Sequence, residues 1–288
     1  MPEAMVIQPD TEIGAAMTAA AETRRLIFYA GLPGVGKSLF LQQQTLMAAR
    51  AGRVVHLLQW DIARAAFETE AILAKYPEVD GFTHPIIRKA AGLWARRAVR
   101  QWNQAFSDPG HLLIGEVPIV GNRFVELLQQ HDDPVEPLLG GEGAMFFVPV
   151  PSGEVRAKIE AKRQASIANP KHANESRDAP LNVLEQIWQD ARTTAAILGL
   201  VPEAQAAAGT GYDPLTYERL FAHMLQHRNC RILHVDTLYP ASGSVYELAV
   251  PTHELAAPPA EISAIMTELE NSHSLAALSQ AVADWHRV

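Results

Sequence analysis

The sequence predicts an α/β fold with a mainly parallel sheet covered by helices on both faces. Short apolar runs alternate along the chain with longer segments of helical periodicity. Such alternation is typical of parallel sheets, because the connection between two parallel strands places a helix against a face of the sheet. The composition agrees with this class: the 288 residues are 48% hydrophobic and 19% charged, which is ordinary for a globular chain.

Five apolar runs are predicted to form the strands of this sheet. They cover residues 25–30, 53–60, 111–116, 144–150 and 230–236. One helix is predicted to begin near Asn122, and helical spacing predicts the others over residues 37–52, 61–76, 86–106, 151–167, 181–200 and 213–226. This order predicts a leader at 1–24, a core at 25–250, and a proline-rich linker with a helical tail at 251–288. The tail is expected to pack on the core, to mediate self-association or to be a loose appendage.

Charge and cysteine content narrow the partners and the compartment. The formal net charge is −8, so we expect no extended nucleic-acid site and favour a small-molecule partner. Cys230 is the single cysteine, so no intrachain disulfide can form, and a cytoplasmic location is expected. No run approaches the ~18 apolar residues of a membrane span, so no membrane contact is expected. No feature of the sequence specifies an oligomeric state.

The most informative stretch is FYAGLPGVGKSLFL, residues 28–41, which follows a predicted strand and opens a predicted helix. A glycine loop in this position presents backbone N–H groups to phosphates, while its lysine reaches the terminal phosphates and its serine holds Mg²⁺. The sequence therefore predicts a site for a nucleoside triphosphate and Mg²⁺. The residues expected to bind the nucleotide are Gly31, Gly34, Val35, Gly36, Lys37, Ser38 and Leu39.

Two carboxylates, Asp61 and Glu116, stand at the carboxyl ends of the second and third predicted strands. Ligands of open parallel sheets bind at this edge, and phosphoryl transfer uses a carboxylate near the metal and one that accepts the acceptor hydroxyl's proton. Asp61 is our first choice for the general base, and Glu116 is expected to join Ser38 at the metal, although the two carboxylates can exchange roles. The alternative to a catalytic role is that each carboxylate only caps the helix that follows its strand.

Cationic side chains are expected to cover the phosphates from a lid. Arg156, Arg163 and Arg177 would neutralise the transferring group, since they lie in a helix and a polar segment that can close over the loop. The polar segment, residues 168–180, is the best candidate for a mobile stretch. Asn122 and Arg123, just beyond Glu116, are predicted to contact the acceptor or to cap a helix.

A second cationic group lies on the helix predicted over residues 86–106. Its members are Arg88, Lys89, Arg96, Arg97 and Arg100. Either they receive an acidic or phosphorylated substrate, or they form an ordinary solvated face.

These features together resemble the P-loop kinases of small molecules, the group that contains nucleoside monophosphate kinases and zeta-toxin-like kinases. GLPGVGKS matches their phosphate loop, VPSGEVRAKIEAKR is similar to the strand and helix that begin the lid, and SRDAPLNVLEQIW is similar to the lid's far side. The resemblance implies a three-layer α/β/α P-loop NTPase fold with a five-stranded sheet, a lid at about 156–178, and residues 236–245 beside the base. The chain departs from nucleotide kinases where a second lid arginine is expected, near Gln186.

The function predicted from the sequence is ATP-dependent transfer of a γ-phosphoryl group to a hydroxyl, or a phosphate, of a small molecule. The sequence does not identify the acceptor, which can be a nucleotide, a sugar, an antibiotic or another small alcohol. It also does not decide between ATP and GTP as the phosphoryl donor. The alternative is a P-loop ATPase or a nucleotide-binding regulatory protein that has no small-molecule acceptor.

Overall fold

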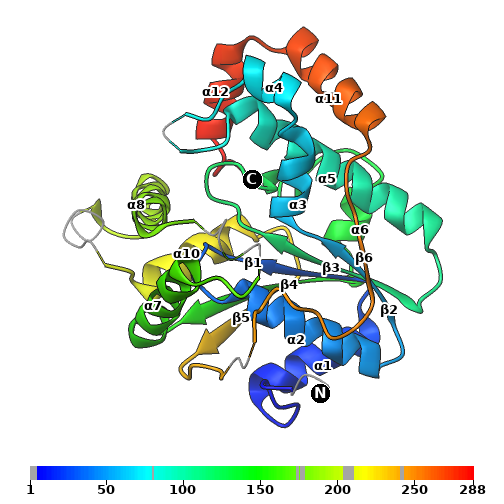
Figure 1. The fold of residues 1–288 in the computed structure, drawn as a ribbon, viewed down its shortest axis with the longest axis vertical. Helices are drawn as coiled ribbons and strands as arrows, with labels where there is room; N and C mark the ends of the chain where they lie inside the picture. The colour runs from blue at the N-terminus through cyan, green and yellow to red at the C-terminus, as the bar shows by residue number, and fades with distance from the viewer. Residues whose placement is uncertain (1–4, 80, 173–174, 176–178, 204–210, 241–242) are drawn as a thin grey trace.

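A computed structural model describes residues 5–79, 81–172, 175, 179–203, 211–240 and 243–288. Its centre is one sheet of six strands in the order β5-β4-β1-β3-β2-β6, and every neighbouring pair is parallel (Figure 1). The strands are β1 (Leu26–Ala30), β2 (Val54–Leu58), β3 (His111–Val117), β4 (Ala144–Pro151), β5 (Cys230–Val235) and β6 (Thr252–Glu254). The predicted α/β class and the parallel sheet are confirmed.

The predicted number of five strands is wrong, because part of the expected linker forms β6. Thr252 pairs with Val55 and Glu254 with Leu57, and the amide of Leu255 donates to the Leu57 carbonyl at 2.8 Å. This short strand covers the edge of β2, whose backbone groups would otherwise have no partner. Three residues are too few to show a hydrophobic periodicity, so the conformation of Thr252–Glu254 is decided by its pairing with a strand distant in the sequence.

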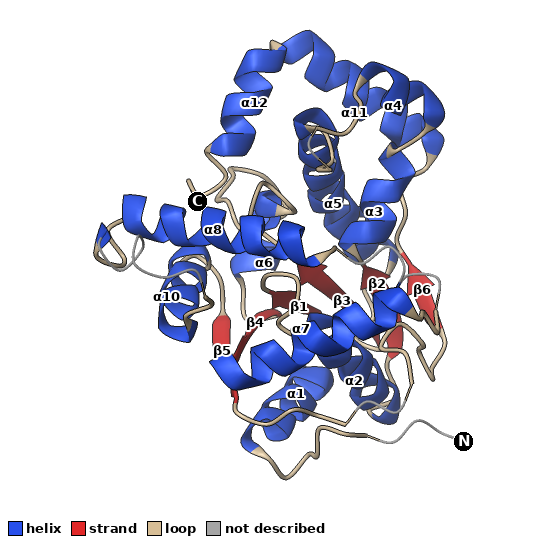
Figure 2. Ribbon diagram, turned by 60° about the vertical axis from the view of Figure 1, so that its left-hand side comes forward, coloured by secondary structure: helices blue, strands red, loops and turns tan. Residues whose placement is uncertain are grey.

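Helices cover both faces of the sheet (Figure 2). On one face, Ile27, Tyr29 and Leu57 belong to a core with α1 (Glu12–Thr23) and α2 (Lys37–Arg50). On the other face, Phe28 and Phe146 belong to a larger core with α3 (Trp60–Phe67), α5 (Pro85–Ala105), α8 (Leu181–Ile197) and α10 (Pro214–Met224). The other helical segments are α4 (Glu70–Lys75), η1 (Val125–Leu127), α6 (Glu136–Gly140), α7 (Gly153–Ala168), α11 (Pro259–Ser272) and α12 (Leu275–Ala283). The expected leader thus contributes α1, which packs against α2.

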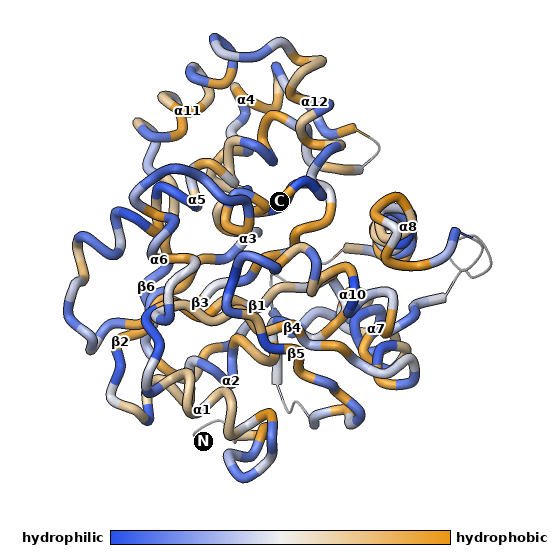
Figure 3. The backbone as a smooth tube through the Cα atoms, turned by 180° about the vertical axis from the view of Figure 1, so that it is seen from behind, coloured by the Kyte–Doolittle hydropathy of each residue, from blue (hydrophilic) through white to orange (hydrophobic). Residues whose placement is uncertain are grey.

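The tail packs on the core, so it is not a loose appendage. Helices α11 and α12 lie along α5 (Figure 1), and their apolar positions alternate with polar ones (Figure 3). Ile265 and Leu269 are buried in the larger core, and the Trp94 indole donates to Glu261 at 3.0 Å. Arg97 and Glu268 form an ion pair at 2.7 Å. The tail therefore secures α5, whose first turn lies near the cavity described below.

Two predicted helices differ from the structure. The helix expected over 61–76 is divided, because Thr69 accepts a hydrogen bond from the Ile72 amide and caps a new helix, α4. No helix begins at Asn122, where Ile119, Asn122 and Phe124 have φ of 62–63°. This left-handed backbone is incompatible with an α-helix, and only the 3₁₀ turn η1 follows it.

No helix in the described part of the chain is both long enough and apolar enough to cross a membrane.

Three histidines meet at the edge of the sheet formed by β2, β3 and β6. His56 is buried, its Nε2 lies 3.0 Å from His111 Nδ1, and its ring centroid lies 5.2 Å from that of His253. Burial, followed by the effects of His111, His253 and Arg25, lowers the pKa of His56 to about 4. These neighbours favour the neutral imidazole in the folded protein.

We expect the free energy of unfolding to fall as the pH decreases from about 6.5 to about 4. In this window the unfolded chain binds a proton at His56 and the folded chain does not, so acid favours unfolding by up to about 3 kcal/mol. Urea titrations across this range should show a shallower pH dependence for His56→Gln than for the original protein. The exposed His273 supplies the control, since His273→Gln should leave the dependence unchanged. Equal slopes for His56→Gln and the original protein would contradict this account.

Candidate functional site

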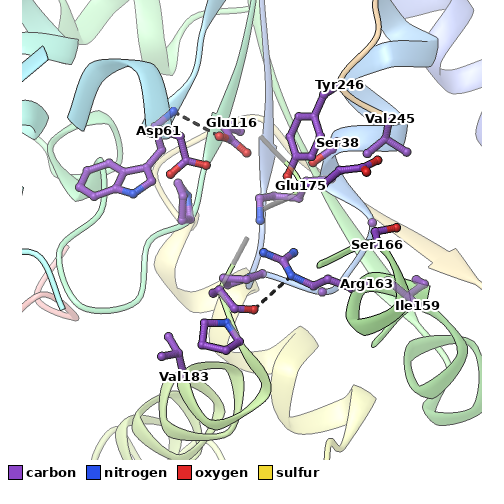
Figure 4. Close-up of a pocket in the computed structure, with 18 of the residues that line it drawn as sticks. Ser38, Asp61, Glu116, Ile159, Arg163, Ser166, Glu175, Val183, Val245 and Tyr246 are labelled. Atoms are coloured by element: carbon purple, nitrogen blue, oxygen red, sulfur yellow. Dashed lines mark hydrogen bonds between the residues drawn. The ribbon is translucent and has the colours of Figure 1, made fainter. Parts of the chain in front are cut away.

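A cavity of about 720 Å³ opens at the carboxyl edge of the sheet (Figure 4). Strand β1 lies between β3 and β4, so the chain crosses from one side of β1 to the other at this edge. Open α/β sheets bind ligands at such a point. The walls come from the loop after β1, the ends of β2 and β3, helix α7, the start of α8, and a later group made of Leu238, Tyr239, Gly243, Val245 and Tyr246.

The glycine loop forms the floor of the cavity between β1 and α2. Gly34 and Gly36 have φ of 84° and 89°, and this left-handed conformation suits glycine. The residues of the loop that line the cavity are Pro33, Gly34, Gly36, Lys37, Ser38 and Leu39. Val35 is buried in the core. Gly31 lies against Tyr217, because a Cβ at Gly31 would be 2.5 Å from the tyrosine hydroxyl.

Lys37 is held at the base of the cavity with little contact to solvent. Its Nζ donates a hydrogen bond of 2.9 Å to the Leu32 carbonyl, and the residue is 6% exposed. Burial lowers the pKa of Lys37 to about 8, while Glu116 acts to raise it and Arg163 to lower it. A partly desolvated ammonium that donates to a neutral carbonyl is well prepared to bind an anion.

Asp61 and Glu116 lie on the same wall of the cavity (Figure 4). Glu116, in β3, accepts a hydrogen bond of 3.2 Å from the Trp60 amide and so caps the start of α3. Burial raises the pKa of the Glu116 carboxyl to about 7, and Lys37 opposes that rise. The Asp61 side chain is 65% exposed and lies 3.5 Å from Arg64. The structure thus brings both predicted carboxylates to one place, with Asp61 the more accessible.

Helix α7 supplies cations from the opposite wall. Lys162 and Arg163 line the cavity, and Arg163 Nε donates to the Ala179 carbonyl at 3.3 Å. Arg156, predicted to act on the phosphates, does not line the cavity: it is 3% exposed, pairs with Glu160 at 2.7 Å and lies 4.3 Å from the Tyr212 ring centroid. The predicted Arg177 lies outside the described residues.

Of the two residues predicted to contact the acceptor, one lines the cavity and the other does not. Arg123 lines the cavity, and its Nη1 donates to the Val120 carbonyl at 2.5 Å. Asn122 is 1% exposed and does not line the cavity, since its amide donates to Glu126 Oε1 at 3.1 Å. The left-handed backbone at Asn122 turns the two neighbouring side chains in different directions.

Most cations of α5 are neutralised by carboxylates rather than directed at the cavity. Lys89 pairs with Glu126 at 2.8 Å, and Arg96 pairs with Asp133 at 2.7 Å. Arg97 pairs with Glu268 of the tail, as described above. The predicted substrate-binding role of this helix face is therefore not supported for these three residues, which join elements of the fold.

Sequence reasoning missed several residues around the cavity. Glu175 is 5% exposed, accepts a hydrogen bond of 2.6 Å from the Lys171 amide and lines the cavity beside Tyr246 (Figure 4). Gln42 donates to the carbonyls of Ser244 and Glu247 at 3.1 and 2.8 Å and so holds the segment that carries Tyr246. Three consecutive glutamines in an otherwise apolar helix were the available signal, because such residues are buried only when they are hydrogen-bonded.

The groups that line the cavity are of the kind that binds a nucleoside triphosphate with Mg²⁺. The loop offers glycines with a left-handed backbone, the buried Lys37 and the hydroxyl of Ser38, and Glu116 lines the same cavity. Within the described ranges, no cluster of three or more His, Cys, Asp or Glu side chains is arranged to hold a metal ion. A metal here would take further ligands from phosphate and water, as Mg²⁺ commonly does.

Comparisons of this chain with protein families, with curated proteins and with solved structures give no match.

Proposed function

We propose that this protein is an ATP-dependent kinase that transfers the γ-phosphoryl group to a hydroxyl of a small molecule. The observation that carries the proposal is a glycine loop with a buried lysine at the floor of a cavity whose wall bears Asp61 and Glu116. The loop matches GxxxxGKS and stands between a strand and a helix, which is the context that this motif requires. The same features support the P-loop NTPase class for this fold, and the sequence resemblance to small-molecule kinases supports that group within the class.

The size of the cavity favours transfer to an acceptor over simple hydrolysis. The glycine loop occupies only one part of a space of about 720 Å³, and Trp60, Phe82 and Thr83 line another part near Asp61. A mixed aromatic and polar wall is typical of small-molecule sites. We therefore assign the region of Asp61, Phe82 and Arg123 to the acceptor, and the region of Tyr239 and Tyr246 to the base.

In the proposed reaction, a bond forms between the acceptor oxygen and the γ-phosphorus while the bond from that phosphorus to the β–γ bridging oxygen breaks. ADP leaves, and the acceptor's hydroxyl proton passes to the Asp61 carboxylate. Lys37 and Arg163 stabilise the negative charge on the phosphates, and most of the rate acceleration comes from such positioning and charge because the transition state is loose. Bound Mg²⁺ would neutralise phosphate charge, and Ser38 and Glu116 would hold it.

The experiment that tests the proposal is ATP consumption by the purified protein with Mg²⁺, alone and with a library of hydroxyl-bearing metabolites, followed by mass spectrometry. We expect one acceptor class to gain the mass of a phosphoryl group. Steady release of ADP and free phosphate that no acceptor alters would favour the alternative of an ATPase. Tight nucleotide binding with no turnover would favour a regulatory protein.

A further inference from the structure

Two arginines converge at the acceptor end of the cavity. Gly121 lies between them: a Cβ at this position would be 3.0 Å from Arg88 Nη1 and 3.3 Å from Arg123 Nη1. Arg88 reaches this point from α5, and Arg123 from the loop after β3. Both guanidinium groups are thus directed at the same short segment of backbone.

Their hydrogen bonds do not neutralise this positive charge. Arg88 Nη1 donates to the Gly121 carbonyl at 2.7 Å, and Arg123 donates to the Val120 carbonyl, so both bonds end on uncharged acceptors. Arg88 Nε is buried and has no hydrogen-bond partner. For neither arginine does any carboxylate of the described ranges form an ion pair. This differs from Lys89, Arg96 and Arg97 on the same helix.

Charged groups of both signs surround the two guanidinium groups. Burial together with Arg88 and Arg64 lowers the pKa of Arg123 to about 10, against the opposing effects of Asp190 and Asp61. Burial also lowers the pKa of Arg88, and Asp190 opposes that change. Placing two poorly solvated guanidinium groups together is unfavourable unless an anion joins them. An oxyanion in the cavity would accept hydrogen bonds from Arg123, which lines the cavity, while Arg88 lies beside it without lining the cavity. The guanidinium fork matches carboxylate and phosphate oxygens.

We infer that Arg123, supported by Arg88, forms an anion subsite and that the acceptor carries a phosphate or carboxylate group in addition to its hydroxyl. Arg123 lines the cavity with Asp61 and Phe82, so an anionic group held there lies in the same space as the proposed base. The identity of the bound molecule as the acceptor rests on the proposed function, but the binding of an anion does not. Neutral sugars and simple alcohols are then poor acceptors.

The subsite is tested by isothermal titration with inorganic phosphate and with malonate, which stand in for the two kinds of anion. The titrations use the Lys37→Ala protein, in which the glycine loop is weakened. We expect one or both anions to bind, and Arg123→Gln added to this background to weaken binding about 10-fold or more. Arg88→Gln should have a smaller effect. The control is Arg100→Gln, which removes the same charge from an exposed position of α5 and should change nothing.

Each outcome decides the inference. Stronger binding of phosphate points to a phosphorylated acceptor, and stronger binding of malonate to an acidic one. Arg123→Lys keeps the charge and should retain part of the affinity, which separates lost recognition from lost folding. Absence of binding by either anion, or equal affinity in Arg123→Gln, overturns the subsite. A parallel ADP titration of the original protein reports on the nucleotide site alone, so anion binding without ADP binding contradicts the proposed function and leaves the subsite intact.

Discussion

Replacing Lys37 by alanine is expected to reduce phosphoryl transfer by roughly three orders of magnitude or more while the protein stays folded. Lys37 is a buried cation in the glycine loop, and in the proposed reaction the loss of this preorganised donor removes charge stabilisation that exists only when the phosphates are in place. The fold should survive because the ammonium is partly desolvated and donates its hydrogen bond to the carbonyl of Leu32, five residues earlier in the same loop, so no distant element of the described ranges depends on it. Single-turnover assays with the acceptor that the metabolite library reveals measure the effect.

Lys158→Ala is the matched control for this experiment. Lys158 lies on α7, is 54% exposed, pairs with Glu154 and does not line the cavity, so its removal takes away the same charge without touching the site. Circular dichroism and thermal melting check that both variants are folded. Comparable turnover of Lys37→Ala and Lys158→Ala would contradict the role of the glycine loop.

The sequence was sufficient to predict features that follow from the order of strands and helices along the chain. The glycine loop could be located because strand, loop and helix follow one another within 25 residues, and the structure has β1 and α2 there. Asp61 and Glu116 could be placed together because parallel strands end at the same edge of a sheet. Neither inference needed knowledge of a contact between distant residues.

The remaining features depend on contacts that periodicity does not encode. Arg156 turns away from the cavity because Glu160, one helical turn later, and the ring of Tyr212 hold it. Asn122 is occupied by Glu126, and β6 exists only through its pairing with β2. Each of these outcomes required a specific partner, which a pattern of apolar and polar residues does not identify.

Glu116 illustrates why a strand-ending carboxylate has two compatible roles. It accepts the Trp60 amide and so stabilises the start of α3, the helix whose first turn contains Asp61. The same carboxylate faces Lys37 closely enough that each changes the pKa of the other. The cap uses one carboxylate oxygen, Oε1, so the other oxygen could serve the proposed metal. Replacing the Glu116 side chain is therefore expected to disturb both the position of Asp61 and the proposed Mg²⁺ site.

Replacing Asp61 by asparagine is expected to preserve ATP binding and to slow transfer by roughly two to four orders of magnitude. Asparagine has nearly the same shape but does not accept the acceptor's proton, and the glycine loop is untouched. ATP affinity from equilibrium titration and the single-turnover rate together test this expectation. Asp10→Asn, at an exposed position before α1, is the control for the same change of charge.

The comparison of Asp61→Asn with Glu116→Gln then assigns the base. If Asp61 accepts the proton, Asp61→Asn binds ATP·Mg²⁺ normally and fails in transfer, whereas Glu116→Gln loses affinity for Mg²⁺ as well, since it would lose a metal ligand. If Asp61→Asn behaves like the original protein and Glu116→Gln is inactive with normal Mg²⁺ affinity, the two roles are reversed. The greater exposure of Asp61 and the engagement of Glu116 with the Trp60 amide favour the first result.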